Sequence, residues 1–365
     1  MSILRRSCIL TVVTFIGLIG FSYVNPEKLE EDFWGCKGRR IVHIYKDTID
    51  EFSDSQIIEL QDKDSIPIWF ARHIFKDVCI SGKCKMIRLW LFWDGVGNYF
   101  GFQLHENEPL TKSDHTIFEQ ADYEKLEEIL RDSTSILGKL KQEDLVIIPD
   151  SIDNPYELDG YTAATQPSLA EVVVKDAVYT CHTLWHTVYG ATREEINRLL
   201  EERIDADFLR CILKTGDIEK IIWVIETVKK HPEYHPAFYP DFIECIKSKN
   251  ELLARKALNY FGHDMLTDEL IQKELVSEMP FFTKETNVEL IWRFIENGGV
   301  TEDVFLQLLQ YIREKKLQLS FLNLIYQLIQ PYYLKKQEIK VILESFLKDE
   351  NAYVRSLTKK VLETN

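Results

Sequence analysis

A pair of histidines is one feature of this chain that could do chemistry. His182 and His186 lie four positions apart in residues 172–190, a stretch rich in aromatic and histidine side chains. If this stretch is a helix that ends at Gly190, both imidazoles share one face and could hold a metal ion or approach a cofactor. The Glu of an H-E-x-x-H protease is missing, and paired histidines without a third ligand are usually structural. We therefore expect packed or hydrogen-bonded histidines, with a metal site as the alternative.

The heptapeptide Asp159–Thr165, DGYTAAT, carries a second signal. It resembles the D-x-x-[ST]-G-A-[ST] motif of FMN-binding domains, which occur in exported subunits of membrane redox complexes of the Rnf and sodium-translocating quinone reductase types. In that family a flavin transferase moves FMN from FAD onto the last hydroxyl residue as a phosphoester, and the resemblance places this residue at Thr165. The other matching positions are Asp159, Gly160, Thr162 and Ala164.

This attachment chemistry needs a hydroxyl nucleophile on an exposed turn, small neighbours that let the flavin and the transferase approach, and N–H groups for phosphate oxygens. Two features depart from the family pattern: Ala163 replaces Gly where a positive φ would be costly, and Gln166-Pro167 replace small or hydroxylated residues. The resemblance implies bound FMN, a flavin transferase and a membrane redox partner. A related fold without the flavin and a plain loop before a helix stay open.

The N-terminus has the composition of a targeting segment. Arg5 and Arg6 precede Cys8–Val24, a run of seventeen residues without a charge. A basic start followed by such a run predicts that residues 1–24 are a signal peptide or a membrane anchor. The body of the protein is then exported, to the periplasm or the cell envelope.

Length and composition predict a globular chain with two folded units. The 365 residues exceed one ordinary domain, and hydrophobic residues make up 45% and charged residues 28% of the chain. The net charge of −15 repels phosphate backbones, so we expect no nucleic-acid partner. Cys79 and Cys84 flank a turn at Gly82 and are expected to form either a disulfide or two free thiols.

Residues 34–190 predict an α+β domain with an antiparallel hairpin sheet and packed helices. Met86–Trp93 and Asn98–Leu104 read as two strands joined by a turn. A helix is expected in Asp114–Leu130, with Asp114 or Asp122 as its cap. Ser113 or Asp114 in that role explains the cluster around Lys112 and His115 better than a phosphate site does. Three aromatic residues of the hairpin could stack on a flavin or belong to the core: Trp90, Trp93 and Tyr99.

Residues 192–365 predict an all-α domain. Thr192 and Glu195 have the T-x-x-E spacing of a capping box. Further helices are expected at Ile218–Lys230, Phe238–Lys247, Glu251–Phe261, Val288–Asn297, Glu302–Arg313, Ser320–Ile329 and Gln337–Leu347. Leu253–Leu258 and Tyr353–Thr358 echo each other, and the closing stretch resembles the second helix of HEAT repeats, which implies a solenoid that docks a protein partner. An irregular helical domain is the alternative.

Together these patterns predict an exported FMN-binding redox accessory or electron-transfer protein with a helical docking domain. A flavin-free envelope scaffold is the alternative. The sequence contains no G-x-S-x-G elbow, P-loop or G-x-G-x-x-G after a strand, so an electron carrier or binding protein is expected in preference to a stand-alone enzyme.

Overall fold

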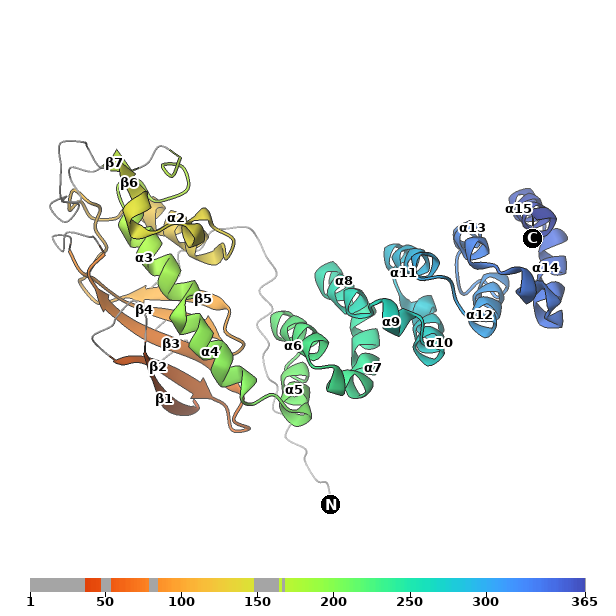
Figure 1. Cartoon of the computed structure of the whole chain (residues 1–365), viewed down its shortest axis with the longest axis horizontal. Helices are drawn as coiled ribbons and strands as arrows, with labels where there is room; N and C mark the ends of the chain where they lie inside the picture. Colours follow the sequence, from red (N-terminus) through yellow and green to blue (C-terminus); the bar gives the residue numbers. More distant parts are fainter. Residues whose placement is uncertain (1–36, 47–53, 79–84, 148–163, 166–167, 365) are drawn as a thin grey trace, which may run out of the picture. The chain divides into compact units, whose positions relative to one another are not determined.

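The computed structural model describes residues 37–46, 54–78, 85–147, 164–165 and 168–364. The chain divides into two compact units, with the boundary after Arg203. The first unit is α+β and the second is all-α, as the sequence predicts (Figure 1). The expected targeting segment 1–24, the Cys79–Cys84 pair and most of the heptapeptide lie outside the described residues.

The first unit contains a five-stranded antiparallel sheet in which each strand pairs with the next along the chain. The strands are β1 (Arg39–Lys46), β2 (Asp54–Gln61), β3 (Pro67–Lys76), β4 (Ile87–Asp94) and β5 (Tyr99–Leu104). The predicted hairpin is β4–β5, and Asp94 closes its turn by accepting from the backbone N–H groups of Val96 and Asn98. Gly97 has φ +82° there, a conformation that glycine adopts without strain.

Helices α2 (Gln120–Arg131), α3 (Val178–Tyr189) and α4 (Ala191–Glu201) belong to this unit, and α3 and α4 follow each other along one face of the sheet (Figure 1). The indole Nε1 of Trp93, on β4, donates to the carbonyl of Val188 at 3.2 Å. Arg72, on β3, donates to the hydroxyl of Thr192 at the start of α4. These bonds connect strands and helices about a hundred residues apart in the chain.

The predicted helix in Asp114–Leu130 begins later than expected, at Gln120. Its capping box joins Glu119 and Asp122, so Asp122 takes part in the cap as one of the predicted residues, whereas Ser113 and Asp114 do not. Asp114 accepts from the backbone N–H and the hydroxyl of Thr116, within a tight turn that carries His115 at φ 65°. Lys112, considered as a phosphate ligand, forms an ion pair with Asp122 at 2.9 Å.

The predicted capping box at Thr192 and Glu195 is also wrong. Helix α4 starts at Ala191 with Gly190 as its N-cap, and Thr192 is fully buried within the first turn. Its hydroxyl bonds to Tyr45 at 2.8 Å and accepts from Arg72. Because α4 packs on the sheet, the boundary between the units lies after Arg203, one helix later than the domain limits 34–190 and 192–365 expected from the sequence.

The second unit is a row of helices: α5 (Ala206–Leu213), α6 (Ile218–Lys230), α7 (His235–Ile246), α8 (Glu251–Tyr260), α9 (His263–Leu266), α10 (Glu269–Glu278), α11 (Lys284–Glu296), α12 (Glu302–Arg313), α13 (Leu322–Ile325), α14 (Gln337–Leu347) and α15 (Ala352–Thr364). Helices α6, α8, α11 and α13 contact one another in succession, and so do α10, α12 and α14. Helices α7 and α8, and α14 and α15, form pairs. Each helix therefore packs on near neighbours in the sequence (Figure 1).

The helix predictions hold best where the apolar stripe is regular. Helices α6, α12 and α14 have the predicted limits at both ends. The expected helix 320–329 is wrong, because that stretch divides into α13 and two 3₁₀ turns, Leu319–Phe321 and Tyr326–Leu328. The two echoing segments lie on α8 and α15, where Ala254 and Val354 are buried and Arg255 and Arg355 are exposed.

Candidate functional site

Thr165 lies on a two-residue strand and not on the exposed turn that the attachment chemistry predicts. Strand β7 (Ala164–Thr165) pairs antiparallel with β6 (Val146–Ile147), with Thr165 opposite Val146. The Thr165 side chain is half-buried, and it has no hydrogen-bond partner among the described residues. Of the other matching positions, the structure places Ala164 beside it, whereas Asp159, Gly160 and Thr162 lie outside the described residues.

The strand that holds Thr165 is attached to the core of the first unit. The 3₁₀ segment η3 (Gln142–Leu145) leads directly into β6, and Leu145 and Val146 are buried. The Gln142 side chain donates to the carbonyl of Val78, just beyond the end of β3, at 2.7 Å. Segment η3 also packs on α3, so the segment that leads into β6 is held both by the chain just after β3 and by this helix.

His182 and His186 lie together on α3, with ring centroids 4.2 Å apart. Nε2 of His182 donates to the carbonyl of Leu140 at 2.9 Å, and Nε2 of His186 donates to that of Leu137 at 3.0 Å. Burial lowers the pKa of His182, which favours the neutral ring. Within the described ranges no group of three His, Cys, Asp or Glu side chains is arranged to hold a metal ion. The two imidazoles attach the segment 137–140 to the helix.

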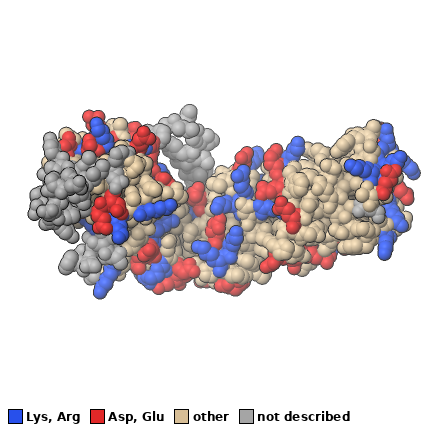
Figure 2. All heavy atoms as spheres, turned by 45° about the horizontal axis from the view of Figure 1, so that its top comes forward, with Lys and Arg blue, Asp and Glu red and all other residues tan. Residues whose placement is uncertain are grey.

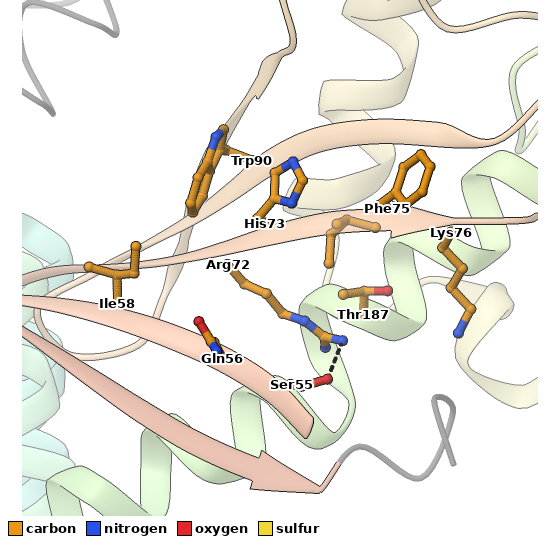
Figure 3. A pocket seen from close by; sticks show the side chains of 10 residues that line it. Ser55, Gln56, Ile58, Arg72, His73, Phe75, Lys76, Trp90 and Thr187 are labelled. Carbon is orange, nitrogen blue, oxygen red and sulfur yellow. Dashed lines mark hydrogen bonds between the residues drawn. The ribbon is translucent and has the colours of Figure 1, made fainter. Parts of the chain in front are cut away.

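The sheet opens between β2 and β3. Their pairing runs from Gln61 opposite Pro67 to Ile58 opposite Ala71, after which β2 continues against β1 and β3 against β4. The diverging strands border a cavity of about 360 Å³ (Figure 3). Its lining residues come from three strands and from α3: Ser55, Gln56, Ile58, Arg72, His73, Ile74, Phe75, Lys76, Trp90 and Thr187.

Arg72 is the best-fixed side chain of this cavity. It is only 4% exposed, and its Nη2 donates to the hydroxyl of Ser55 at 2.9 Å, which bridges the opening between the strands (Figure 3). Its guanidinium also donates to Thr192 and lies 5.5 Å from the ring of Tyr45. Lys76 adds a second cationic side chain to the lining. The sequence signal for both is the presence of two basic residues in strand 67–76, whose other residues are apolar except for His73.

The other side of the cavity is aromatic. The His73 and Trp90 rings lie 5.0 Å apart, and Phe75 is largely exposed. Burial lowers the pKa of His73, and the charges of Arg88 and His105 lower it further, so its ring is held neutral. Its Nε2 is buried and has no hydrogen-bond partner among the described residues. A neutral imidazole of this kind can donate to or accept from a ligand.

Of the three aromatic residues expected as stacking partners, only Trp90 lines this cavity. Trp93 is fully buried in the core, where its indole bonds to α3. The hydroxyl of Tyr99 donates to Glu127 at 2.9 Å, and burial raises the pKa of Tyr99 well above its usual range. Trp93 and Tyr99 therefore serve packing between the sheet and its helices.

The fold and this geometry define a protein with an α+β unit, which combines an anchored threonine with a cationic and aromatic cavity, followed by a row of paired helices. Comparisons with protein-family models, curated proteins and solved structures gave no match to the chain. In the described part of the chain, no helix is long and apolar enough to cross a membrane.

Proposed function

We propose that this chain is an exported redox accessory protein that carries FMN on Thr165 of its α+β unit. The proposal rests on the position, burial and hydrogen bonding of Thr165. This residue ends the DGYTAAT motif on an anchored strand, with its side chain half-buried and its hydroxyl without a hydrogen-bond partner among the described residues. A hydroxyl buried and bonded to the backbone would have favoured a purely structural threonine. A partly exposed threonine on a fixed strand suits a modification site.

FAD is the donor of the FMN group in the attachment reaction. Thr165 Oγ forms a bond to the phosphorus of the FMN half, the pyrophosphate bond of FAD breaks, and AMP leaves as the hydroxyl proton is lost to a base. FMN, when bound, supplies one- and two-electron transfer. The cavity between β2 and β3 does not include Thr165 in its lining, but its aromatic rings and its Arg72 and Lys76 cations are of the kind that bind planar, negatively charged groups.

The test is to purify the chain from the envelope of a host that also expresses a flavin transferase. We expect the intact mass to rise by one FMN less water, with yellow colour that survives denaturation and maps to the peptide containing Thr165. Thr165→Ala should abolish the modification and Thr165→Ser should retain it. Ser168→Ala, an exposed hydroxyl three residues away, is the matched control and should leave it unchanged. Flavin retained on Thr165→Ala contradicts the assignment.

A flavin-free envelope scaffold is the second candidate function. It is favoured by the large apolar side chains that the helical unit exposes, among them Phe281 at 68%, Tyr353 at 57% and Tyr332 at 56%. Exposed aromatic side chains on a row of paired helices are typical of surfaces that bind other proteins. An unmodified, colourless wild-type chain in the experiment above would favour this function over the flavin carrier.

A further inference from the structure

The helical unit contains a groove that neither candidate function uses. It has a volume of about 460 Å³ and lies where the C-terminal ends of α8 and α11 meet α9. Its lining residues are Asn259, Phe261, Gly262, His263, Leu266, Glu289, Trp292, Arg293, Glu296 and Asn297. All of them lie within the described part of the second unit.

The electrostatics of this groove favour a cation. Helices α8 and α11 both end here, and the carbonyl groups at a helix C-terminus carry a partial negative charge. Two carboxylates, Glu289 and Glu296, add full negative charges to the lining. Glu289 is paired with Arg293 at 2.6 Å, whereas exposed Glu296 has no ion pair among the described residues. The groove therefore keeps an unneutralised carboxylate beside two helix ends.

Arg293 shows how these helix ends bind a guanidinium. Its Nη1 donates to the carbonyl of Leu258, in the last turn of α8, at 2.9 Å. Its Nη2 donates to Glu289 and to the side-chain oxygen of Asn259. One arginine of the chain is thus already held by carbonyl, amide and carboxylate oxygens. Glu296, on the α11 side of the groove, is a carboxylate that could accept hydrogen bonds from a second guanidinium.

Trp292 supplies the aromatic surface that completes such a site. Its side chain lies in the groove and is 43% exposed, although a side chain of this size is usually well buried. Trp is the best of the aromatic rings for binding a cation over its face. Asn297 bonds to His263 and to the carbonyl of Arg293, and Arg293 itself bonds to Glu289 and to the side-chain oxygen of Asn259. Trp292 and Glu296 are the aromatic ring and the carboxylate of the lining that remain for a cationic ligand.

We propose that this groove binds an arginine side chain presented by a partner protein. The guanidinium would stack on Trp292 and donate to Glu296, as Arg293 already donates to Glu289. Two carboxylates and one guanidinium line the groove, a local balance that favours the approach of a cationic side chain. An anionic ligand is disfavoured by the two carboxylates and the two helix ends. This site belongs to the helical unit and does not depend on flavin attachment at Thr165.

The probe is the blocked tripeptide acetyl-Gly-Arg-Gly-amide, tested on the full chain by saturation-transfer NMR of the arginine protons. Acetyl-Gly-citrulline-Gly-amide has almost the same shape without the charge and is the matched probe. We expect saturable binding of the arginine peptide that weakens with added salt, weaker binding of acetyl-Gly-Lys-Gly-amide, and no binding of the citrulline peptide.

Variants then assign the binding to the groove. Trp292→Ala should abolish it, and Glu296→Gln should weaken it about threefold to fivefold, the effect of losing one partly exposed ion pair. Phe281→Ala removes another exposed aromatic side chain and Glu285→Gln another exposed carboxylate of α11; both should bind as the wild type does. Circular dichroism checks that each variant is folded.

Three results would overturn the proposal. Equal binding of the arginine and citrulline peptides would show that the positive charge of the guanidinium does not contribute to binding. Full binding by folded Trp292→Ala would place the peptide elsewhere. Tighter binding of free arginine than of the blocked peptide would point to a small-molecule site, because its free ammonium and carboxylate groups would then make contacts that a residue within a partner's chain cannot make.

Discussion

The clearest residue-scale feature of the first unit is a fully buried carboxylate. Glu59, on β2, accepts from Arg203 Nη2 at 2.8 Å and Gln61 Nε2 at 2.8 Å, and it contacts His43 at 2.7 Å. Burial alone would raise the pKa of Glu59, but the hydrogen bonds from Arg203, Gln61 and His43 outweigh it and lower the pKa. Since Arg203 ends the first unit, this cluster fastens the chain after α4 to the sheet.

Arg203→Ala should destabilise the first unit by about 3 kcal/mol, because it leaves Glu59 buried without its cation. Urea denaturation at pH 7 measures the change. Glu59→Gln in the same chain should recover part of the loss, since the buried charge is then removed. A denaturation midpoint for Arg203→Ala equal to that of the wild type would contradict this role.

The lowered pKa of Glu59 also fixes a pH dependence. The unfolded chain takes up the proton first as the pH falls, so the stabilisation is present above the ordinary glutamate pKa of about 4.3 and is lost as the pH falls through the folded value. The free energy of unfolding of the wild type should therefore fall more steeply below pH 4.3 than that of Glu59→Gln. Parallel curves would show that the carboxylate contributes nothing to acid sensitivity.

At this scale, the sequence predicted candidate residues that form a pattern with nearby positions in the chain. Thr165 stands in a local motif, and His182 and His186 share a helix turn. Glu59 and Arg72 could not be found in this way, because their partners Arg203 and Thr192 are more than a hundred residues away. Thr192 was misread for the same reason, since its spacing to Glu195 indicates a cap while its hydroxyl serves the sheet.

At the scale of elements, the 3₁₀ segment η2 (Ile136–Lys139) is held against α3 by side chains of the helix. His182 and His186 bond to carbonyls of this region, and the indole of Trp185 donates to the carbonyl of Asp132 at 2.9 Å. Because η3 and β6 follow directly, the position of Thr165 depends on this packing. The sequence predicted α3 and its two histidines but not the segment on which they act.

Gly138 is the position of η2 least able to carry a side chain. A Cβ atom there would lie 2.4 Å from Cη2 of Trp185, whose ring is fixed by its bond to Asp132. Gly138→Ala should therefore destabilise the first unit by about 1–3 kcal/mol. Thermal unfolding measures the effect, and Gly101→Ala is the control, because a Cβ at Gly101 meets nothing within 4 Å. Equal losses in the two variants would contradict the packing described here.

The histidines of α3 should make this region sensitive to acid. Burial lowers the pKa of His182, and a charge on His186 lowers it further, although the bond to Leu140 opposes both. The unfolded chain therefore binds the proton first, and stability is lost as the pH falls below the ordinary histidine pKa of about 6.5. Hydrogen exchange of residues 136–147 should be faster at pH 5.5 than at pH 7.5, after correction for the intrinsic rate. His182→Gln, which can still donate to Leu140, should show a smaller difference; an unchanged difference would assign the effect to another group.

At the scale of the whole molecule, the two units differ in how far their contacts reach along the chain. In the first unit a hydrogen bond between Tyr45 and Thr192 joins β1 to α4, whereas each helix of the second unit contacts helices that are close to it in the sequence. The amphipathic stripes predicted most helices because those contacts are local, but they could not show how 319–328 would break into short turns.

On the face drawn in Figure 2, Lys and Arg lie interspersed with Asp and Glu, so the net charge of the sequence describes no single-sign surface there.

If the second unit behaves as a solenoid, its stability should be a sum of neighbouring contacts, and loss of the last pair should leave the rest folded. Ending the chain after Lys336 removes α14 and α15, including the bond of 2.7 Å between Thr358 and Tyr326. We expect the shortened protein to keep its remaining helices and to unfold cooperatively in urea at a lower midpoint. Circular dichroism measures both. Tyr326→Phe in the full chain, which removes only that bond, should cost about 1 kcal/mol. Complete loss of helical signal from the second unit in the shortened protein would instead indicate a single globular core and would remove the basis for the HEAT-like interpretation.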